Sequence, residues 1–207
     1  MDGSGKSTQS ILLRQSLMEQ GARVVLIHPF GRKLLAIIPK HVAPKAAANA
    51  RHMQPSLIQR VAAIAEILDI GLYVWVAYIR CLVFALLGRR DVWLVSDRWF
   101  DDLLVKHRRA GTLPTPVLAM TRRLVPHIDT TIWLHTEPHV AMKRDQDFKR
   151  GYYEELHAVY TAAAERYGWR IIPTSGQSPQ AVFERVSETL DVAVPSVHDV
   201  TSAEQAR

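Results

Sequence analysis

The residues with the clearest chemistry open the chain, as Met1-Asp2-Gly3-Ser4-Gly5-Lys6-Ser7-Thr8. They match all but the first glycine of the phosphate-binding pattern Gly-x-x-x-x-Gly-Lys-Ser/Thr. Gly3 and Gly5 allow successive backbone N–H groups to converge on phosphate oxygens. Lys6 reaches the β- and γ-phosphates, and the Ser7 hydroxyl binds Mg²⁺. A glycine-rich turn is the other interpretation, but an amphipathic helix follows in the required place. The motif therefore predicts a site for ATP and Mg²⁺.

A second group of reactive side chains follows the apolar segment VWLVS, as Asp97-Arg98-Trp99-Phe100. An acidic residue at the carboxyl end of a buried parallel strand lies at the cleft where such sheets bind ligands. Asp97 can there hold the Mg²⁺ shell or accept a proton from the attacking oxygen, and Arg98 can clamp an acceptor phosphate. The alternative is a turn or helix-capping aspartate beside a surface arginine. With the phosphate loop present, we favour the functional interpretation.

The elements that must position these residues alternate between helices and short apolar strands. Helical spacing predicts a helix over 6–20, which Gly21 ends. Strands are predicted over 22–27, 92–96, 130–135 and 170–173, and further helices over 56–87 (broken near Gly71), 138–148, 152–167 and 180–190. Residues 38–55 are predicted to form a mobile loop with short helical pieces. The alternation indicates an α/β fold whose parallel sheet is covered by helices on both faces.

The strand that normally feeds the phosphate loop, and the first glycine of the motif, would both precede Met1. In this architecture that strand lies in the middle of the sheet. Without it, the strands on either side keep unpaired N–H and C=O groups. We therefore expect the native chain to begin upstream of Met1, with about six to ten apolar residues that end in glycine.

Length and composition limit the class of protein. The 207 residues suit one domain, and 48% apolar with 22% charged residues exclude a disordered chain, a collagen-like fibre and a coiled coil. The net charge of +6 favours anionic partners, and the single Cys81 excludes an internal disulfide. No secretory signal follows Met1, and the uncharged run 70–79 is far shorter than the roughly 20 residues of a spanning helix. We therefore expect a cytoplasmic protein in which this run is a buried helix or a subunit interface.

Together these segments resemble the thymidylate kinase family of P-loop nucleoside-monophosphate kinases. The resemblance is carried by DGSGKSTQ, by the strand that ends in Asp-Arg-aromatic and by WLHTEPHVAMKR at 133–144. It implies a three-layer P-loop kinase fold around a five-stranded parallel sheet. A single kinase domain would span 1–194, with a lid at about 143–153, and a polar tail at 195–207 would be disordered. It also implies transfer of the γ-phosphoryl group of ATP to a (deoxy)nucleoside monophosphate.

Carried over by position, the ATP-binding residues of the family fall on Gly3, Ser4, Gly5, Lys6, Ser7 and Thr8. The resemblance gives catalytic roles to Lys6, Asp97, Arg98 and Arg144, and places Ser7 and Asp97 at the metal. Arg144 matches the lid arginine of the family, near the adenine and phosphates. A basic lid is physically reasonable, because phosphoryl transfer needs cations to neutralise the transferred group. Further candidates are Lys143, Lys149 and Arg150, and the alternative for this cluster is a solvated helix face.

Two segments depart from the family pattern. His28-Pro29-Phe30-Gly31-Arg32 stands where the family has an Arg-Glu-Pro-Gly type of segment, so the proline is kept and the acid is lost. Asp101 and Asp102 follow Asp-Arg-aromatic, where the family usually has a serine. This second pattern is similar to a less well-defined thymidylate-kinase-like branch. The phosphate donor is therefore better defined than the acceptor, which need not be dTMP.

Several histidine and basic residues give weaker indications. His135 and His139 are four residues apart, but Pro138 and the end of a strand prevent a shared helix face, so we expect no metal site there. Residues 106–109 can contact an acceptor phosphate or form a solvated loop, and we favour the loop. Residues 175–176 are a candidate contact to adenine.

The aromatic residues Tyr73, Trp75 and Tyr78 suit core or dimer packing better than base stacking. Members of the family commonly pair through such helices, so the resemblance implies a homodimer. A kinase of a non-nucleotide acceptor and a nucleotide-binding or nucleic-acid-binding protein without turnover stay open as alternatives. The charge is spread along the chain and no aromatic residues interleave with a basic stripe, so we expect neither nucleic acid nor membrane as a partner.

Overall fold

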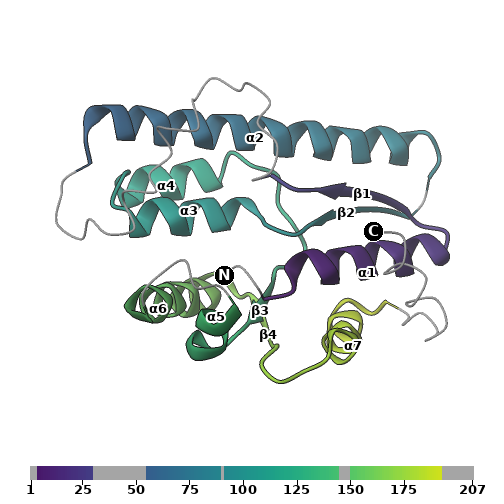
Figure 1. Cartoon of the computed structure of the whole chain (residues 1–207). Coiled ribbons are helices and arrows are strands. Elements are labelled where there is room, and N and C mark those ends of the chain that lie inside the picture. The colour runs from purple at the N-terminus through teal and green to yellow at the C-terminus, as the bar shows by residue number, and fades with distance from the viewer. Residues whose placement is uncertain (1–3, 30–54, 90, 145–149, 193–207) are drawn as a thin grey trace.

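The computed structural model describes residues 4–29, 55–89, 91–144 and 150–192, in which helices and strands alternate along the chain (Figure 1). The strands are β1 (Arg23–Ile27), β2 (Val92–Ser96), β3 (Ile132–His135) and β4 (Arg170–Pro173). The helices are α1 (Lys6–Glu19), α2 (Leu57–Leu86), α3 (Phe100–Arg109), α4 (Thr115–Arg122), α5 (Pro138–Arg144), α6 (Arg150–Tyr167) and α7 (Pro179–Leu190). All four predicted strands are confirmed. The loop predicted over 38–55 lies almost wholly outside the described residues, and the tail at 195–207 lies entirely outside them.

The described strands form two separate parallel pairs. β1 pairs with β2, from Arg23 opposite Val92 to Ile27 opposite Ser96. β3 pairs with β4, from Ile132 opposite Arg170 onward. The parallel pairing confirms the α/β class. The expected single five-stranded sheet is not formed among the described residues, since the strand expected to join the two pairs is not among them.

Helices α1 and α2 lie on opposite faces of the β1–β2 pair (Figure 1). Successive side chains of a strand point to opposite faces, so Val25 packs toward α2 with Ile67 and Val74. On the other face, Leu13 of α1 packs with Val95 and with α7. This half of the molecule is therefore layered as helix, strand pair and helix, consistent with the predicted three layers.

The β3–β4 pair is held by α6 and α7. Trp133 of β3 packs with Tyr160 and Ala164 of α6. Leu134 and Ile172, from the two strands, pack with residues of α7. Since α7 also packs against α1, it connects the two strand pairs through their apolar cores.

Helix α2 is continuous, so the predicted break near Gly71 is wrong. Its start carries a capping box, in which Ser56 Oγ accepts from the Gln59 amide and Gln59 Oε1 accepts from the Ser56 amide. A glycine inside a helix costs about 1 kcal/mol, and the packing of α2 on β1, β2 and α3 outweighs this cost. A Cβ at Gly71 would meet only Phe100 and Val125 side-chain atoms, at 3.9 Å.

Of the two interpretations of 70–79, a buried helix or a subunit interface, the first holds only for the inner face of α2. Leu72 and Ile79 are 47% and 52% exposed, whereas Val74 is fully buried. By length and composition α2 could cross a membrane, and 22% of its most apolar window is buried. The helix therefore covers the strands with one side and exposes an apolar surface with the other.

Two described helices, α3 and α4, were not predicted. Residues 106–109 form the last turn of α3 and not a solvated loop. His107 is 4% exposed, and its Nδ1 lies 2.9 Å from the Thr112 hydroxyl. Burial of one face of α3 against α2 therefore decides the structure of this segment.

Candidate functional site

The beginning of α1 has the properties of an anion-binding site. Ser4 is 3% exposed, and Gly5 precedes the helix with a φ of 84°, a left-handed conformation that favours glycine. Gly5, the N-cap residue, has no side chain that could cap the first turn of α1. The N–H groups in the first turn of a helix have no acceptor within that helix and point out of its N-terminus, which is the arrangement that binds phosphate.

The other residues of the phosphate loop lie in the first turn of α1. Lys6 Nζ donates to Ser4 Oγ at 3.0 Å, while Ser7 and Thr8 are exposed. Gln9 is buried, and its Nε2 donates to the carbonyl oxygen of Pro179 at 2.8 Å, which ties α1 to the start of α7. The structure thus brings Ser4 to Thr8 together at one end of α1. Gly3 lies outside the described residues.

The register of β1 and β2 brings His28 next to Asp97. Ile27 lies opposite Ser96 in the ladder, so the residues that follow each strand are neighbours. His28 Nδ1 lies 2.9 Å from Asp97 Oδ2, and the Asp97 side chain is 13% exposed. α1 is joined to β1 by a short turn and packs against it, so its beginning faces the same end of the strands. Asp97 and Lys6 therefore share one edge of the molecule.

Arg98, on the other side of Asp97, is held by a residue of α3. Arg98 Nη1 donates to Asp102 Oδ2 at 3.3 Å. The hydroxyl of Tyr160, from α6, donates to the second carboxylate oxygen of Asp102. In the sequence, Asp102 was only a departure from the family pattern, and Tyr160 was the last residue of the segment EELHAVY at 154–160, which resembles the family, with no role assigned to it. Their separation of 58 residues gave no local signal.

A histidine pair lies at the end of β3. His135 Nε2 and His157 Nε2 are 2.7 Å apart, and the ring of Trp133 meets the ring of His135 at 5.0 Å. Burial and the neighbouring His157 lower the pKa of His135. His139 instead lies 3.2 Å from Glu137. Within the described residues, no three His, Cys, Asp or Glu side chains converge as metal ligands.

Glu66, on the inner face of α2, joins this helix to α3. Lys106 Nζ donates to both carboxylate oxygens of Glu66, at 2.7 and 2.9 Å, and His107 Nε2 lies 3.4 Å from one of them. Burial alone would raise the pKa of Glu66, but His107 and Lys106 together lower it to about 2. Lys106, a candidate phosphate contact in the sequence, is therefore engaged within the protein.

Most of the predicted lid lies outside the described residues. Arg144 is the last residue of α5 and Arg150 the first of α6, but neither side chain is among those described. Lys143 is exposed on α5. After β4, Ser175 Oγ accepts a hydrogen bond from the Glu137 amide at 3.0 Å, which holds the loops after β3 and β4 together.

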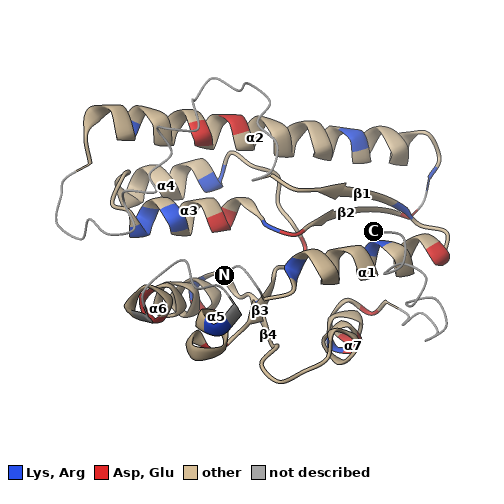
Figure 2. Ribbon diagram, in the orientation of Figure 1, with Lys and Arg blue, Asp and Glu red and all other residues tan. Residues whose placement is uncertain are grey.

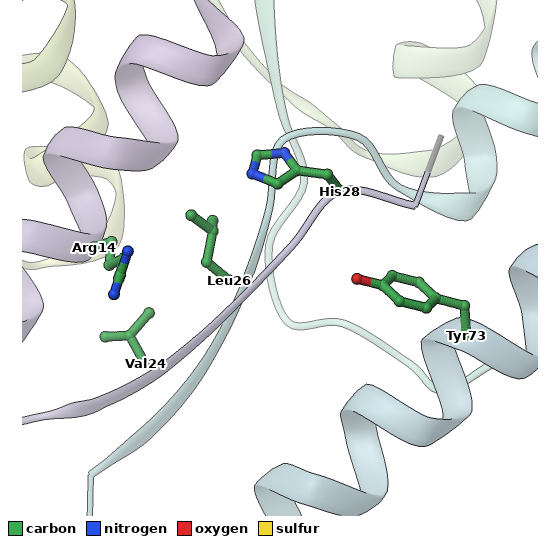
Figure 3. Close-up of a pocket in the computed structure, with 5 residues that line it drawn as sticks. All are labelled: Arg14, Val24, Leu26, His28 and Tyr73. Atoms are coloured by element: carbon green, nitrogen blue, oxygen red, sulfur yellow. The ribbon is translucent and has the colours of Figure 1, made fainter. Parts of the chain in front are cut away.

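A pocket of about 230 Å³ lies along β1 (Figure 3). It is lined by Arg14 of α1, by Val24, Leu26 and His28 of the β1 segment, and by Tyr73 of α2. In Figure 3 the Tyr73 hydroxyl points toward the strand from the side opposite Arg14. Only His28 connects this pocket with the candidate site, through its contact with Asp97. We therefore take the start of α1, and not this pocket, as the candidate site.

The residues at this edge suit a nucleoside triphosphate and its metal. Uncapped amides at the start of α1 and the Lys6 ammonium match phosphate oxygens. The Ser7 hydroxyl and the Asp97 carboxylate are oxygen ligands, which Mg²⁺ prefers. Alanine at position 5 would be strained by the positive φ of Gly5, although the space around it is open.

Comparisons with known proteins find the fold and no sequence family. No protein-family model matches the chain, and no curated protein sequence matches it. Among solved structures, the chain is similar to thymidylate kinase from Ehrlichia chaffeensis, with a TM-score of 0.59 and 18% identity over 92% of this chain and 94% of that one. At this identity the likeness concerns the fold alone. The chain therefore has a fold of the thymidylate kinase type.

Proposed function

We propose that the protein is an ATP-dependent phosphotransferase that transfers the γ-phosphoryl group of ATP to a nucleoside monophosphate. The observation that carries the proposal is the uncapped start of α1, with Lys6 in its first turn, at the same edge as Asp97 and Arg98. A thymidylate kinase of known structure with the same fold supports this class of reaction. A cytoplasmic location belongs to the same proposal.

Each residue has a distinct role in the proposed reaction. The first-turn amides of α1 bind the β-phosphate, and Lys6 neutralises the β- and γ-phosphates. Ser7 and Asp97 would hold Mg²⁺, which when bound neutralises charge on the transferred group. His28 orients the Asp97 carboxylate through their 2.9 Å contact.

Two arginines complete the site. Arg98 clamps the phosphate of the acceptor, because a guanidinium matches phosphate geometry. Arg144, with Lys143, Lys149 and Arg150 as further cations of the lid, supplies positive charge near the transferred group. Preorganised charges of this kind lower the barrier because they need no reorganisation during the reaction.

The acceptor is proposed to be a nucleotide. The likeness to a thymidylate kinase makes dTMP the first acceptor to test. A sugar or lipid-linked phosphate is the second candidate, because Asp102 engages Arg98 where the family usually has a serine. The two candidates use the same donor site and differ only in the acceptor.

Calorimetry and an ADP-release assay test the proposed function. We expect wild type to bind ATP with Mg²⁺ and to release ADP with dTMP or another nucleoside monophosphate. Lys6→Ala should lower turnover by about 10²- to 10³-fold, the usual loss when one charge-stabilising donor is removed. Arg89→Ala, an exposed arginine just before the start of β2 and so at the opposite end of that strand from Asp97, is the matched control for loss of positive charge. Wild type that binds ATP but releases no ADP with any nucleotide or sugar phosphate is a nucleotide-binding protein without turnover.

We further propose that the protein is a homodimer that pairs through the outer stripe of α2. This stripe consists of Leu57, Ile58, Val61, Ile64, Leu68, Leu72, Trp75, Val76, Ile79, Leu82, Val83 and Leu86. It runs the length of a helix of about 45 Å. Figure 2 shows that charged residues on α2 are few. Asp69 is buried, Glu66 is paired with Lys106, and Arg60 and Arg80 are exposed. An exposed apolar surface of this length marks an interaction site.

The oligomeric state tests the outer stripe. Leu68→Asp with Ile79→Asp should convert a dimer into a monomer in analytical ultracentrifugation, because each charge would be buried without a partner. Thr189→Asp, on the exposed side of α7, is the control. A monomeric wild type, or one that floats with phospholipid vesicles and loses this property in the double variant, would contradict the dimer.

A further inference from the structure

We propose that Asp102 and Tyr160 are positioning residues that hold the Arg98 guanidinium for the acceptor phosphate. The proposal rests on the proposed function, since it assigns Arg98 to the acceptor. It goes further by naming two residues, on α3 and α6, that act through Arg98. Both were outside the site predicted from the sequence.

Within the described part of the chain, each oxygen of the Asp102 carboxylate accepts a hydrogen bond from a side chain. Arg98 Nη1 donates to Oδ2 at 3.3 Å, and the Tyr160 hydroxyl donates to Oδ1. The side chains of Arg98 and Asp102 are 26% and 14% exposed, so water screens their contact only in part. The carboxylate therefore cannot rotate without weakening both contacts, and its orientation fixes the direction of the guanidinium.

Packing around the Tyr160 side chain restricts its movement. Its side chain is 8% exposed, and its ring lies between Trp133 at 5.8 Å and Trp169 at 6.2 Å, measured between ring centroids. Burial and the charge of Asp102 raise the pKa of Tyr160 well above its ordinary value. The hydroxyl therefore keeps its proton and donates to Asp102 throughout the neutral range.

Asp102 and an acceptor phosphate would both bind the Arg98 guanidinium. The contact with Asp102 does not by itself exclude a phosphate, because an arginine presents five N–H donors and this contact uses one of them. A carboxylate beside a phosphate site repels the ligand, but the hydrogen bond from Tyr160 withdraws charge from Asp102.

Steady-state kinetics with dTMP as the acceptor probe test these roles. Tyr160→Phe should raise the KM for dTMP about three- to tenfold, the range expected for one net hydrogen bond. The KM for ATP should not change. Asp102→Asn should shift the same KM, and Asp102→Glu should restore part of the loss. Tyr167→Phe, on the same helix and also beside Trp169, is the matched control and should match wild type. Equal changes in both KM values, or a lowered melting temperature with unchanged kinetics, would overturn the proposal.

A spectroscopic measurement separates this proposal from the proposed function. In protein labelled with ¹⁵N-arginine, the Arg98 side-chain signal is assigned by its loss in Arg98→Lys. We expect slow hydrogen exchange at this guanidinium in wild type and faster exchange in Tyr160→Phe and Asp102→Asn. Unchanged exchange in both variants defeats the positioning role even if the enzyme turns over. Faster exchange in a protein that phosphorylates no acceptor supports the positioning role and defeats only the kinase.

Discussion

Two surfaces of the molecule are built in opposite ways: the polar edge around Asp97 and the outer stripe of α2. At the polar edge, charged and polar side chains from different segments contact one another, as in His28 with Asp97 and Tyr160 with Asp102. In the outer stripe, all the side chains are apolar and come from one helix. The contacts of the polar edge therefore form only when several strands and helices are correctly placed relative to one another. The outer stripe needs only the helical conformation of α2.

This difference separates chemistry from assembly. A residue of the polar edge acts through direction and charge, so its replacement should affect turnover and leave association unchanged. A residue of the outer stripe acts through apolar area, about 25 cal/mol for each Å² removed from water. Its replacement should affect association first. A single substitution that changes both turnover and association would contradict this separation of the two surfaces.

Asp97→Asn should produce the largest effect. It keeps the size of the side chain but removes the charge that would hold Mg²⁺ and that faces His28. We expect a loss of about 10²- to 10⁴-fold in kcat, the usual range for a catalytic acid–base or charge-stabilising group. Sedimentation should be that of wild type. A variant with wild-type turnover, or one that changes its oligomeric state, would contradict the separation of the two surfaces.

Low pH should cause a smaller effect, a loss of folding stability through Glu66, which lies on the inner face of α2. Its pKa falls from 4.5 to about 2 on folding, so the folded state favours the ionised form. Its stabilisation is complete above the unfolded pKa and is lost as the pH falls from about 4.5 through about 2. The full loss is about 3 kcal/mol before screening is considered.

Chemical denaturation at pH 6 and pH 3 measures this loss. Glu66→Gln should have a lower free energy of unfolding at pH 6 and a weaker dependence on pH in the acid range. Glu165→Gln, an exposed residue of α6, is the control. The same acid dependence in wild type and Glu66→Gln would show that the ion pair with Lys106 does not stabilise the fold.

Local signals in the sequence predicted the four strands and the start of α1. Short apolar runs and the glycine–lysine–serine pattern are confined to a few residues, so no tertiary information is needed to find them. The pairing of His28 with Asp97 also follows from parallel strands that end together, once their register is known. The positions of His28 and Asp97 directly after two predicted strands were therefore a usable signal. The sequence analysis instead interpreted His28 only as part of a segment that departs from the family pattern.

Tertiary packing decided what the sequence could not predict. α3 begins after Trp99 without a side-chain cap, and the acidic Asp101 and Asp102 in its first turn are a signal of a helix start that was not used. α4 has Pro116 in its first turn, a signal of a helix start that was not used. Gly71 suggested a break, but contacts with the strands keep α2 continuous. Tyr160 meets Asp102 only because α6 packs across the end of β3 and α3.

The histidine pair at the end of β3 should give the smallest effect. Burial and the charge of His157 lower the pKa of His135, so protonation is less favourable in the folded than in the unfolded protein. The contribution is absent above the unfolded pKa of about 6.5 and destabilises the fold as the pH falls below it. Melting temperatures of wild type and His157→Gln should therefore agree at pH 8 and differ at pH 5.5, where wild type loses more. His139→Gln, whose histidine faces Glu137, is the control and should follow wild type.

Since the outer stripe of α2 contains no titratable side chain, this pH dependence should be the same in the variant that carries both Leu68→Asp and Ile79→Asp. The comparison uses the difference in melting temperature between pH 8 and pH 5.5, so that the lower stability of the variant at pH 8 is subtracted. A pH dependence that disappears in this variant would mean that the polar edge and the outer stripe are energetically coupled.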